Sequence, residues 1–306
     1  MLQHRHQILA APDGHDIHVQ LWQPPGDVTC GIQVVHGLGE HADRYDRFAA
    51  VAAKRGYAVC VHDHRGHGDH GEEPFHFADV DGWRKVNADV EIVNNFASEQ
   101  FPGKPIVLLG HSMGSFIAQT FAMQSGDRLS GLILSASTWP SRLELAPAYV
   151  IARIEAWRLG IRGQSALLNQ LGFGKFNKPF EPARTEFDWL SRDESEVDKY
   201  LSDPLCGGPY TCGLWLDLLG GLLHISSDKA VIGVPSDLPI LITGGAADPV
   251  GGDKGMTRLA MHYAQTLHQR LRVKVYPDGR HEMLNEINRD EVSKDWLDWV
   301  AATTHT

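Results

Sequence analysis

The chain has 306 residues, of which 42% are hydrophobic and 22% are charged, and its formal net charge is −10 at pH 7. This mixture is typical of an ordinary globular protein, and the length suits one large α/β domain with an insertion, or two domains. The negative charge argues against nucleic acid or a strongly anionic membrane as the main partner. Because the N-terminal residues lack a long apolar segment and no run suits a membrane span, we expect a cytoplasmic protein. Peripheral membrane contact through an amphipathic surface of the cap, defined below, stays open.

Strands and helices alternate along the first 136 residues. Extended segments flank the turn Pro12-Asp13-Gly14, so residues 7–23 are predicted to form a hairpin. Further strands are predicted over residues 31–36, 57–62, 106–109 and 129–136. Helices are predicted over residues 45–56, 83–100 and 115–124. This alternation indicates a mostly parallel sheet with right-handed crossovers.

The alternation stops between residues 137 and 235, a segment rich in Trp, Leu, Phe and Gly. Helices are predicted within it over residues 146–159, 165–171 and 211–226. The alternation then resumes, with strands over residues 238–244 and 272–276 and helices over residues 255–269 and 289–302. We therefore predict an α/β core of residues 1–136 and 236–306. Residues 137–235 would form a helical cap, or lid, over the carboxyl ends of the strands, where open α/β sheets bind ligands.

The strongest functional signal is the segment Ile106–Gly114, which reads I-V-L-L-G-H-S-M-G. Its apolar run is typical of a buried strand, and the residues after it match G-x-S-x-G, the nucleophile elbow. A serine at such a strand-to-helix turn takes a strained, positive-φ conformation. The backbone then packs so closely that small residues are needed two positions before and after it. Gly110 and Gly114 meet that need, so Ser112 is the candidate nucleophile.

A serine nucleophile needs a base and an acid that orients the base, and in this architecture they follow in the order Ser, Asp or Glu, His. Asp248 lies just past a predicted strand, in T-G-G-A-A-D-P-V, and is the candidate acid, with Asp253 the nearest rival. His281 follows the last strand, in Y-P-D-G-R-H-E, and is the candidate base. The carboxyl ends of parallel strands share one edge, so these residues can meet Ser112.

An oxyanion hole needs two backbone N–H groups that point at the developing charge. One would come from Met113, the residue after the nucleophile, and the other from the loop after an earlier strand. The sequence H-G-L-G at residues 36–39 supplies that loop, with Leu38 as the candidate donor.

A second cluster, at residues 62–70, reads H-D-H-R-G-H-G-D-H and could bind zinc on composition alone. The matching metallo-hydrolase signature needs an aspartate where Gly66 stands, so we favour a structural loop in which Asp63 and Arg65 make hydrogen bonds and an ion pair.

Of the four cysteines, Cys30 and Cys60 fall in apolar runs. Cys206 and Cys212 have no metal-ligand spacing, and whether they pair stays open.

Several motifs together resemble one family, the α/β hydrolases that include monoacylglycerol lipases and bacterial lysophospholipases, also described as serine aminopeptidase-like hydrolases. They are H-G-L-G-E-H at 36–41, H-D-H-R-G-H-G at 62–68, G-H-S-M-G at 110–114, and the loops that carry Asp248 and His281. Within the insertion, the segments at 176–180, 184–193 and 203–206 are similar to the bacterial lysophospholipase-like branch. The resemblance implies an α/β-hydrolase fold, a triad of Ser112, Asp248 and His281, and an oxyanion hole of Leu38 and Met113.

The function expected is hydrolysis of carboxylic esters of single acyl chains through an acyl-enzyme, with no metal or organic cofactor. The partner expected is a small-molecule or lipid ester. Apolar residues of the cap are candidates to line an acyl pocket, or else pack the interior of the cap: Trp157, Trp215, Leu218 and Leu222. Two alternatives stay open: an aminopeptidase or amide hydrolase with the same triad, and a non-catalytic ligand-binding protein on this fold.

Overall fold

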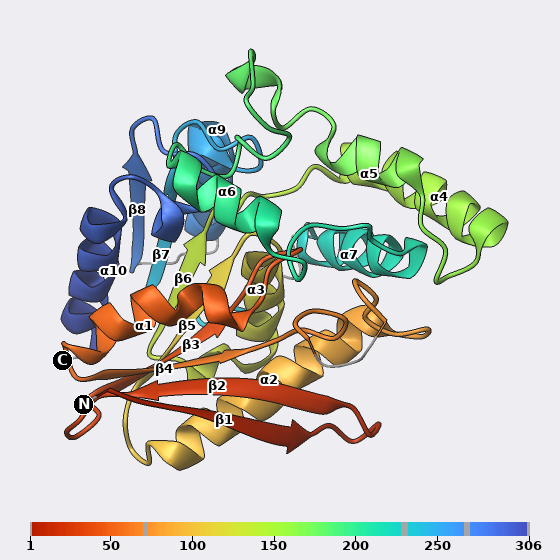
Figure 1. Ribbon diagram of the computed structural model, residues 1–306. Helices are drawn as coiled ribbons and strands as arrows, with labels where there is room; N and C mark the ends of the chain where they lie inside the picture. The colour runs from red at the N-terminus through yellow and green to blue at the C-terminus, as the bar shows by residue number, and fades with distance from the viewer. Residues whose placement is uncertain (1, 70–72, 228–231, 266–269, 305–306) are drawn as a thin grey trace.

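A mostly parallel sheet forms the centre of the protein in a computed structural model, which describes residues 2–69, 73–227, 232–265 and 270–304 (Figure 1). The strand order is β1-β2-β4-β3-β5-β6-β7-β8. The strands β1, β2 and β4 pair antiparallel, and all other neighbours pair parallel. The strands are β1 (Gln3–Ala10), β2 (Asp16–Gln23), β3 (Cys30–Val35), β4 (Tyr57–His62), β5 (Ile106–His111), β6 (Gly131–Ser135), β7 (Ile240–Gly245) and β8 (Leu271–Tyr276).

Helices cover both faces of this sheet because its central strands are apolar on both sides. Every residue of β3, β4, β5 and β6 is buried, as expected for strands enclosed between two helical layers. The neighbours Leu108 and Leu109 point to opposite faces and belong to different cores. The Leu109 core includes α1 (Asp46–Ala53) and α10 (Arg289–Thr304), and the Leu108 core includes α2 (Gly82–Gln100), α3 (Met113–Ser125) and α9 (Gly252–Gln265).

Residues 137–235, between β6 and β7, are called the cap segment below. Its helices gather beyond one end of the sheet (Figure 1). They include α4 (Arg142–Leu159), α5 (Ala166–Phe173), α6 (Glu194–Ser202) and α7 (Cys212–Ile225). The helix α7 packs closely on α2, since a Cβ atom on Gly221 would lie 2.2 Å from the Trp83 ring. The division of the chain into a core and a cap domain stays a prediction.

The predicted fold class, an α/β-hydrolase architecture, is confirmed by the strand order and by the structural neighbours described below. The strand β4 has the predicted bounds, and β3 and β5 begin within one residue of theirs. The helix α6 was not predicted, because only Glu196, Val197 and Tyr200 of its nine residues are buried. The predicted helical residues 266–269, and His70 of the histidine cluster, lie outside the described residues.

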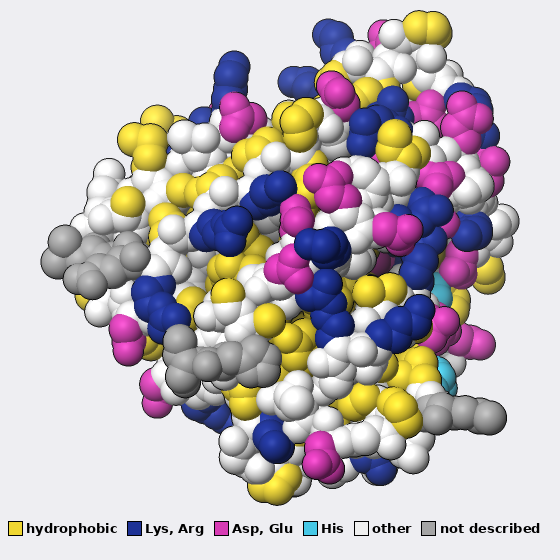
Figure 2. All heavy atoms as spheres, turned by 90° about the vertical axis from the view of Figure 1, so that its left-hand side faces the viewer, with side chains coloured by type: hydrophobic (Ala, Val, Ile, Leu, Met, Phe, Trp, Pro, Cys, Tyr) yellow, Lys and Arg dark blue, Asp and Glu magenta, His cyan; other side chains and the backbone are white. Residues whose placement is uncertain are grey.

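The surface agrees with the modest charge of the chain. On the face that carries α10, basic and acidic side chains intermix with apolar ones rather than gathering by sign (Figure 2). Within the described ranges, no helix is both long enough and apolar enough to cross a membrane.

Candidate active site

Ser112 sits at a strained turn between β5 and α3. Its backbone φ of 52° and ψ of −120° lie in a region that non-glycine residues rarely adopt. Only glycine fits two positions before and two positions after Ser112, because a larger residue would collide with the backbone. A Cβ atom on Gly114 would lie 2.0 Å from the carbonyl oxygen of Val35, and one on Gly110 would lie 2.5 Å from the carbonyl oxygen of Gly114. The Ser112 amide donates to the Ser135 carbonyl oxygen at 3.0 Å, which ties the turn to β6.

Ser112, His281 and Asp248 form a continuous hydrogen-bonded line. His281 Nε2 lies 2.9 Å from Ser112 Oγ, and His281 Nδ1 lies 2.8 Å from Asp248 Oδ1. An ionised carboxylate can only accept, so Nδ1 carries the proton and Nε2 accepts from the serine hydroxyl. Asp248 follows β7 and His281 follows β8, so the parallel strands bring all three to one edge. Asp253, the rival acid, is exposed at the start of α9.

The electrostatics favour an ionised acid and a basic imidazole. Burial alone would lower the pKa of His281, but the charge and hydrogen bond of Asp248 outweigh it and raise this pKa above 6.5. Burial alone would raise the pKa of Asp248, but His281 and the Val250 amide, 2.9 Å from Oδ1, hold it below its usual value. Asp248 Oδ2 is buried without a hydrogen-bond partner among the described residues. His281 is therefore the main group that stabilises the negative charge of the Asp248 carboxylate.

The proposed oxyanion donors lie beside the nucleophile. Leu38 and Met113 line the same cavity as Ser112, and Met113 is the first residue of α3. Gly37 allows the close approach of this loop, since a Cβ atom there would lie 3.3 Å from Ser112 Cβ and 2.7 Å from Glu40 Oε1.

A buried ionic network that the sequence reasoning missed connects this loop with the histidine loop. Arg44 makes two hydrogen bonds of 2.6 Å to the Glu282 carboxylate and one of 3.1 Å to Glu40 Oε2. Glu40 Oε1 in turn accepts from the Gly37 amide at 2.5 Å and the Tyr45 hydroxyl at 3.0 Å. The signal was present: Glu40 stands within the H-G-L-G-E-H motif and Glu282 directly follows the histidine. Their common partner is less visible, because Arg44 stands before α1 without a motif of its own.

The cap segment also contacts the base. The Trp189 ring centroid lies 4.8 Å from that of His281, and the Glu282 amide donates to the Leu190 carbonyl oxygen at 2.8 Å. Trp189 therefore shields His281 from water and helps to fix its loop. No sequence pattern pointed to this role.

A cavity of about 820 Å³ opens beside Ser112 and His281, within the usual range of about 300–1,000 Å³ for ligand sites. Trp215 and Leu218 line it as predicted, and the Trp215 indole N–H donates to Asn169 Oδ1 at 3.0 Å. Trp157 and Leu222, the other two candidates, lie outside the lining. Trp157 is 86% exposed because it faces outward from α4, and Leu222 packs partly buried on the core. Aromatic residues absent from the prediction complete the wall: Phe173, Phe176, Phe187, Trp189 and Tyr210.

The histidine cluster forms a packed interior beneath the oxyanion loop. The rings of His36 and His64 are 4.1 Å apart and those of His62 and His64 are 4.9 Å apart, and all are buried. Burial lowers the pKa of His62 and of His67 to about 4, so both are neutral near pH 7. The structural role predicted for this loop agrees with two interactions: Asp63 Oδ1 accepts from the Ala42 amide at 2.7 Å, and Arg65 pairs with Asp89 at 2.6 Å. All four cysteines, including Cys206 and Cys212, are free thiols.

The fold and this site define an α/β hydrolase, and the comparisons with known proteins identify the family. Residues 28–288 match the family described as Hydrolase_4, serine aminopeptidase, S33, and the chain belongs to this family. The human monoglyceride lipase is 28% identical over 97% of this chain and 91% of its own length. The monoacylglycerol lipase of Mycolicibacterium smegmatis is 26% identical over 96% and 95%, respectively.

Solved structures agree on the fold. A thermostable carboxyl esterase from Bacillus coagulans, in complex with glycerol, has a TM-score of 0.88 at 24% identity, covering 99% of this chain and 100% of that one. A lipase in its open form has a TM-score of 0.89 at 24% identity over the same shares. The chain is thus a lipase- or esterase-like α/β hydrolase, and the family resemblance inferred from its motifs is confirmed.

Proposed function

We propose that the protein hydrolyses carboxylic esters of single acyl chains, of the monoacylglycerol or lysophospholipid type, with Ser112 as nucleophile. The observation that carries this proposal is the hydrogen-bonded line of Ser112, His281 and Asp248 at the wall of a large aromatic cavity. Relatives named monoglyceride lipase and monoacylglycerol lipase, which match nearly the whole chain, support the same substrate class.

In the acylation half of the reaction, Ser112 Oγ attacks the ester carbonyl carbon while His281 Nε2 takes the hydroxyl proton. Asp248 keeps the imidazole in the required tautomer and stabilises the imidazolium that forms. The amides of Leu38 and Met113 donate to the oxyanion of the tetrahedral intermediate. Collapse of this intermediate releases the alcohol, which takes the proton back from His281, and leaves the acyl group on Ser112.

Deacylation repeats these roles with water as the nucleophile. His281 removes a proton from a water molecule that attacks the acyl-enzyme, and the second tetrahedral intermediate releases the fatty acid and restores the Ser112 hydroxyl. Since Trp189 covers His281 on the cap side, water has to enter through the cavity after the alcohol leaves.

The cavity favours a single apolar chain with a polar end. Its wall near the cap is aromatic, while Asn169, Gln170 and Asn177 add amide groups that could bind an alcohol portion. The polar and apolar groups thus match the two ends of a monoacyl ester.

Peripheral contact with lipid surfaces is a further part of this proposal. Leu143, Val150, Ile154 and Trp157 recur on one face of α4, and each is more than half exposed. Such an exposed apolar face is suited to the boundary of a membrane or a micelle, where monoacyl lipids reside.

Hydrolysis of amides with a free amine, as in an aminopeptidase, is the second candidate. This reaction needs a carboxylate in the cavity that can bind the amine. Glu40 and Glu282 line the cavity but are both occupied by Arg44. Glu186 also lines it and is exposed, so it is the carboxylate that could bind an amine at the rim.

The test is a substrate panel under one set of conditions. It would contain p-nitrophenyl esters of graded chain length, monoacylglycerols, lysophospholipids and aminoacyl p-nitroanilides. We expect turnover of the esters and at least one monoacyl lipid, with little turnover of the anilides. Faster turnover of the anilides would favour the amide reading. Failure of the wild-type protein to react with a fluorophosphonate probe, together with inactivity on the whole panel, would favour a non-catalytic binding protein.

A further inference from the structure

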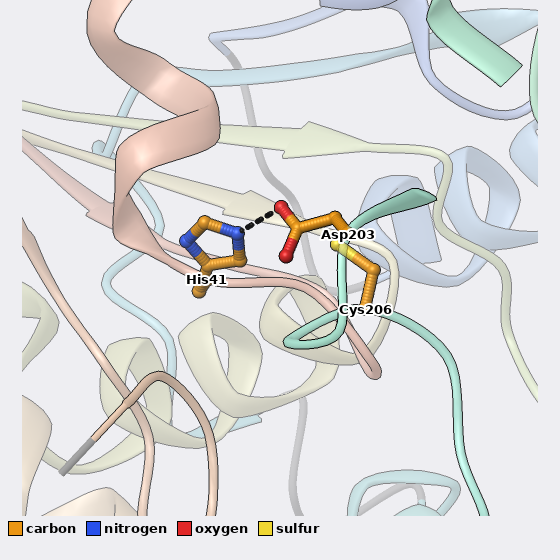
Figure 3. Close-up of side chains that lie close together, drawn as sticks. All are labelled: His41, Asp203 and Cys206. Atoms are coloured by element: carbon orange, nitrogen blue, oxygen red, sulfur yellow. Dashed lines mark hydrogen bonds and ion pairs between the residues drawn. The ribbon is translucent and has the colours of Figure 1, made fainter. Parts of the chain in front are cut away.

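Three side chains with metal-binding atoms meet where the cap segment touches the oxyanion loop (Figure 3). His41 belongs to the loop after β3, and Asp203 and Cys206 belong to the turn after α6. His41 Nε2 lies 2.8 Å from Asp203 Oδ2, and one nitrogen, one oxygen and one sulfur atom of the three residues all lie within 4.8 Å of one another. This group plays no part in the ester hydrolysis described above.

The donor atoms are oriented by their surroundings. Asp203 Oδ1 accepts from the Leu205 amide at 2.9 Å, which leaves Oδ2 directed at His41. The Cys206 amide donates to the Asp203 carbonyl oxygen at 3.1 Å, so the two cap residues are held in one turn. On the other side of the imidazole, Asp43 Oδ2 lies 3.8 Å from His41 Nδ1. A carboxylate behind a histidine is a common outer partner of a metal-bound imidazole, because it favours the tautomer that leaves the other nitrogen free to bind.

We propose that His41, Asp203 and Cys206 form a binding site for one divalent cation of the zinc class. Imidazole, carboxylate and thiolate are the ligands of tetrahedral Zn²⁺, with bonds of about 2.0–2.3 Å. Such bonds place the donors roughly 3.3–3.7 Å apart. The existing separations, from 2.8 Å to at most 4.8 Å, therefore need side-chain shifts of only about 1 Å.

Binding of the cation needs no reagent besides the cation itself and water. The Cys206 thiol releases its proton to solvent and becomes the thiolate ligand. The proton on His41 moves from Nε2 to Nδ1, where it faces Asp43, and Nε2 then binds the cation. The fourth position would hold water.

The position of this site gives it a structural consequence. The Gly207 amide already donates to the Gly39 carbonyl oxygen at 2.9 Å, and a Cβ atom on Gly39 would lie 2.9 Å from the Gly207 carbonyl oxygen, so the two segments touch. A bound cation would link this cap turn to the oxyanion loop. Because the unfolded chain does not hold the three donors together, binding would also stabilise the folded protein.

The experiment uses the full chain, stripped with EDTA and dialysed, and titrated with Zn²⁺ and with Co²⁺. We expect the wild-type protein to bind one Zn²⁺ per chain, and the variants Cys206→Ser and Asp203→Asn to bind it at least tenfold more weakly. The control Cys212→Ser, which changes the cap cysteine outside the cluster, should bind as wild type does. Bound Co²⁺ should show thiolate-to-cobalt charge transfer in the near ultraviolet, and Zn²⁺ should raise Tm by a few degrees in wild type but not in Asp203→Asn.

A measurement on the wild-type protein removes any dependence on how the variants fold. Zn²⁺ should protect Cys206 from alkylation, measured by peptide mass spectrometry, in parallel with its occupancy. Absence of thiolate-to-cobalt charge transfer, unchanged alkylation of Cys206 at saturating Zn²⁺, or equal Zn²⁺ affinity in folded Cys206→Ser would each overturn the proposal. The test is independent of the proposed ester hydrolysis, since none of its readouts uses activity.

Discussion

Replacing Arg44 by methionine should strongly destabilise the protein and impair its active site. Arg44 is buried between two carboxylates. The exposed fraction of its side chain is 11%, and those of Glu40 and Glu282 are 5% and 7%. Methionine fills a similar volume but removes every hydrogen bond to these two side chains. The substitution would leave two buried negative charges facing each other next to His281.

Two observations give the magnitude. Arg44 outweighs burial and holds the pKa of Glu282 well below its usual value, whereas burial raises the pKa of Glu40 despite the same guanidinium, so the two shifts partly oppose each other. Removing one partner from a buried ion pair typically costs about 3–5 kcal/mol. A loss of about 3 kcal/mol in the free energy of unfolding at pH 7 is therefore expected. A carboxyl group whose pKa is lower in the folded than in the unfolded state stabilises the fold at pH values above its unfolded pKa. The contribution of Glu282 should therefore be lost in the wild-type protein as pH falls from about 4.5 to 2.

The assay is urea unfolding at pH 7, with Arg55→Met as the matched control. Arg55 pairs with Asp298 on the surface, where the two side chains are 31% and 48% exposed, so its removal should cost less than about 1 kcal/mol. Adding Glu282→Gln to Arg44→Met should recover part of the loss, because one of the two unpaired charges is removed. Equal stability of the Arg44→Met and Arg55→Met variants, or no recovery in the double variant, would refute this reasoning.

Three further predictions follow from the buried titrating groups and the exposed helix face. Since Asp248 holds the pKa of His281 above 6.5 and the base must be neutral, kcat/KM for a neutral ester should fall with decreasing pH through a midpoint above 6.5; a midpoint below 6.5 contradicts this assignment. Burial lowers the pKa of His62 and His67 to about 4, so the unfolded chain binds protons first and stability should fall as pH drops from about 6.5 towards 4. His62→Gln should reduce that fall by about 1 kcal/mol per pH unit in urea unfolding, and an unchanged slope would count against it. Trp157→Ser should weaken sedimentation with lipid vesicles severalfold and leave hydrolysis of a soluble short ester within about twofold, whereas unaltered sedimentation would exclude this contact.

The strands and the elbow could be predicted because local chemistry determines them. A buried parallel strand must be a continuous apolar run, and the elbow needs glycine two positions before and after its serine. The collisions that a Cβ atom on Gly110 or Gly114 would meet show this need directly. Asp248 and His281 were found by their order and their place after strands, and the structure brings both to Ser112 within hydrogen-bonding distance.

Features that join distant segments could not be predicted in the same way. Arg44 meets Glu282 across 238 residues, and Trp189 reaches His281 from the cap segment, so neither contact leaves a periodic pattern. Trp157 and Trp215 are both tryptophans on cap helices, yet one faces solvent and the other the cavity. The choice between these faces depends on how the helices pack on the core, which spacing along one helix does not reveal.

The most direct test of the central claim is the hydrolysis rate of a p-nitrophenyl ester by Ser112→Ala beside the wild-type protein. Loss of the nucleophile should lower kcat by roughly 10⁶-fold, or to the limit of detection. Without Ser112, only direct attack by water on the bound ester remains, and the oxyanion hole accelerates that attack weakly. The variant should unfold in urea close to the wild-type midpoint, because the alanine removes one partly exposed hydroxyl. Ester hydrolysis at a rate near that of wild type, in a folded Ser112→Ala protein, would contradict the account.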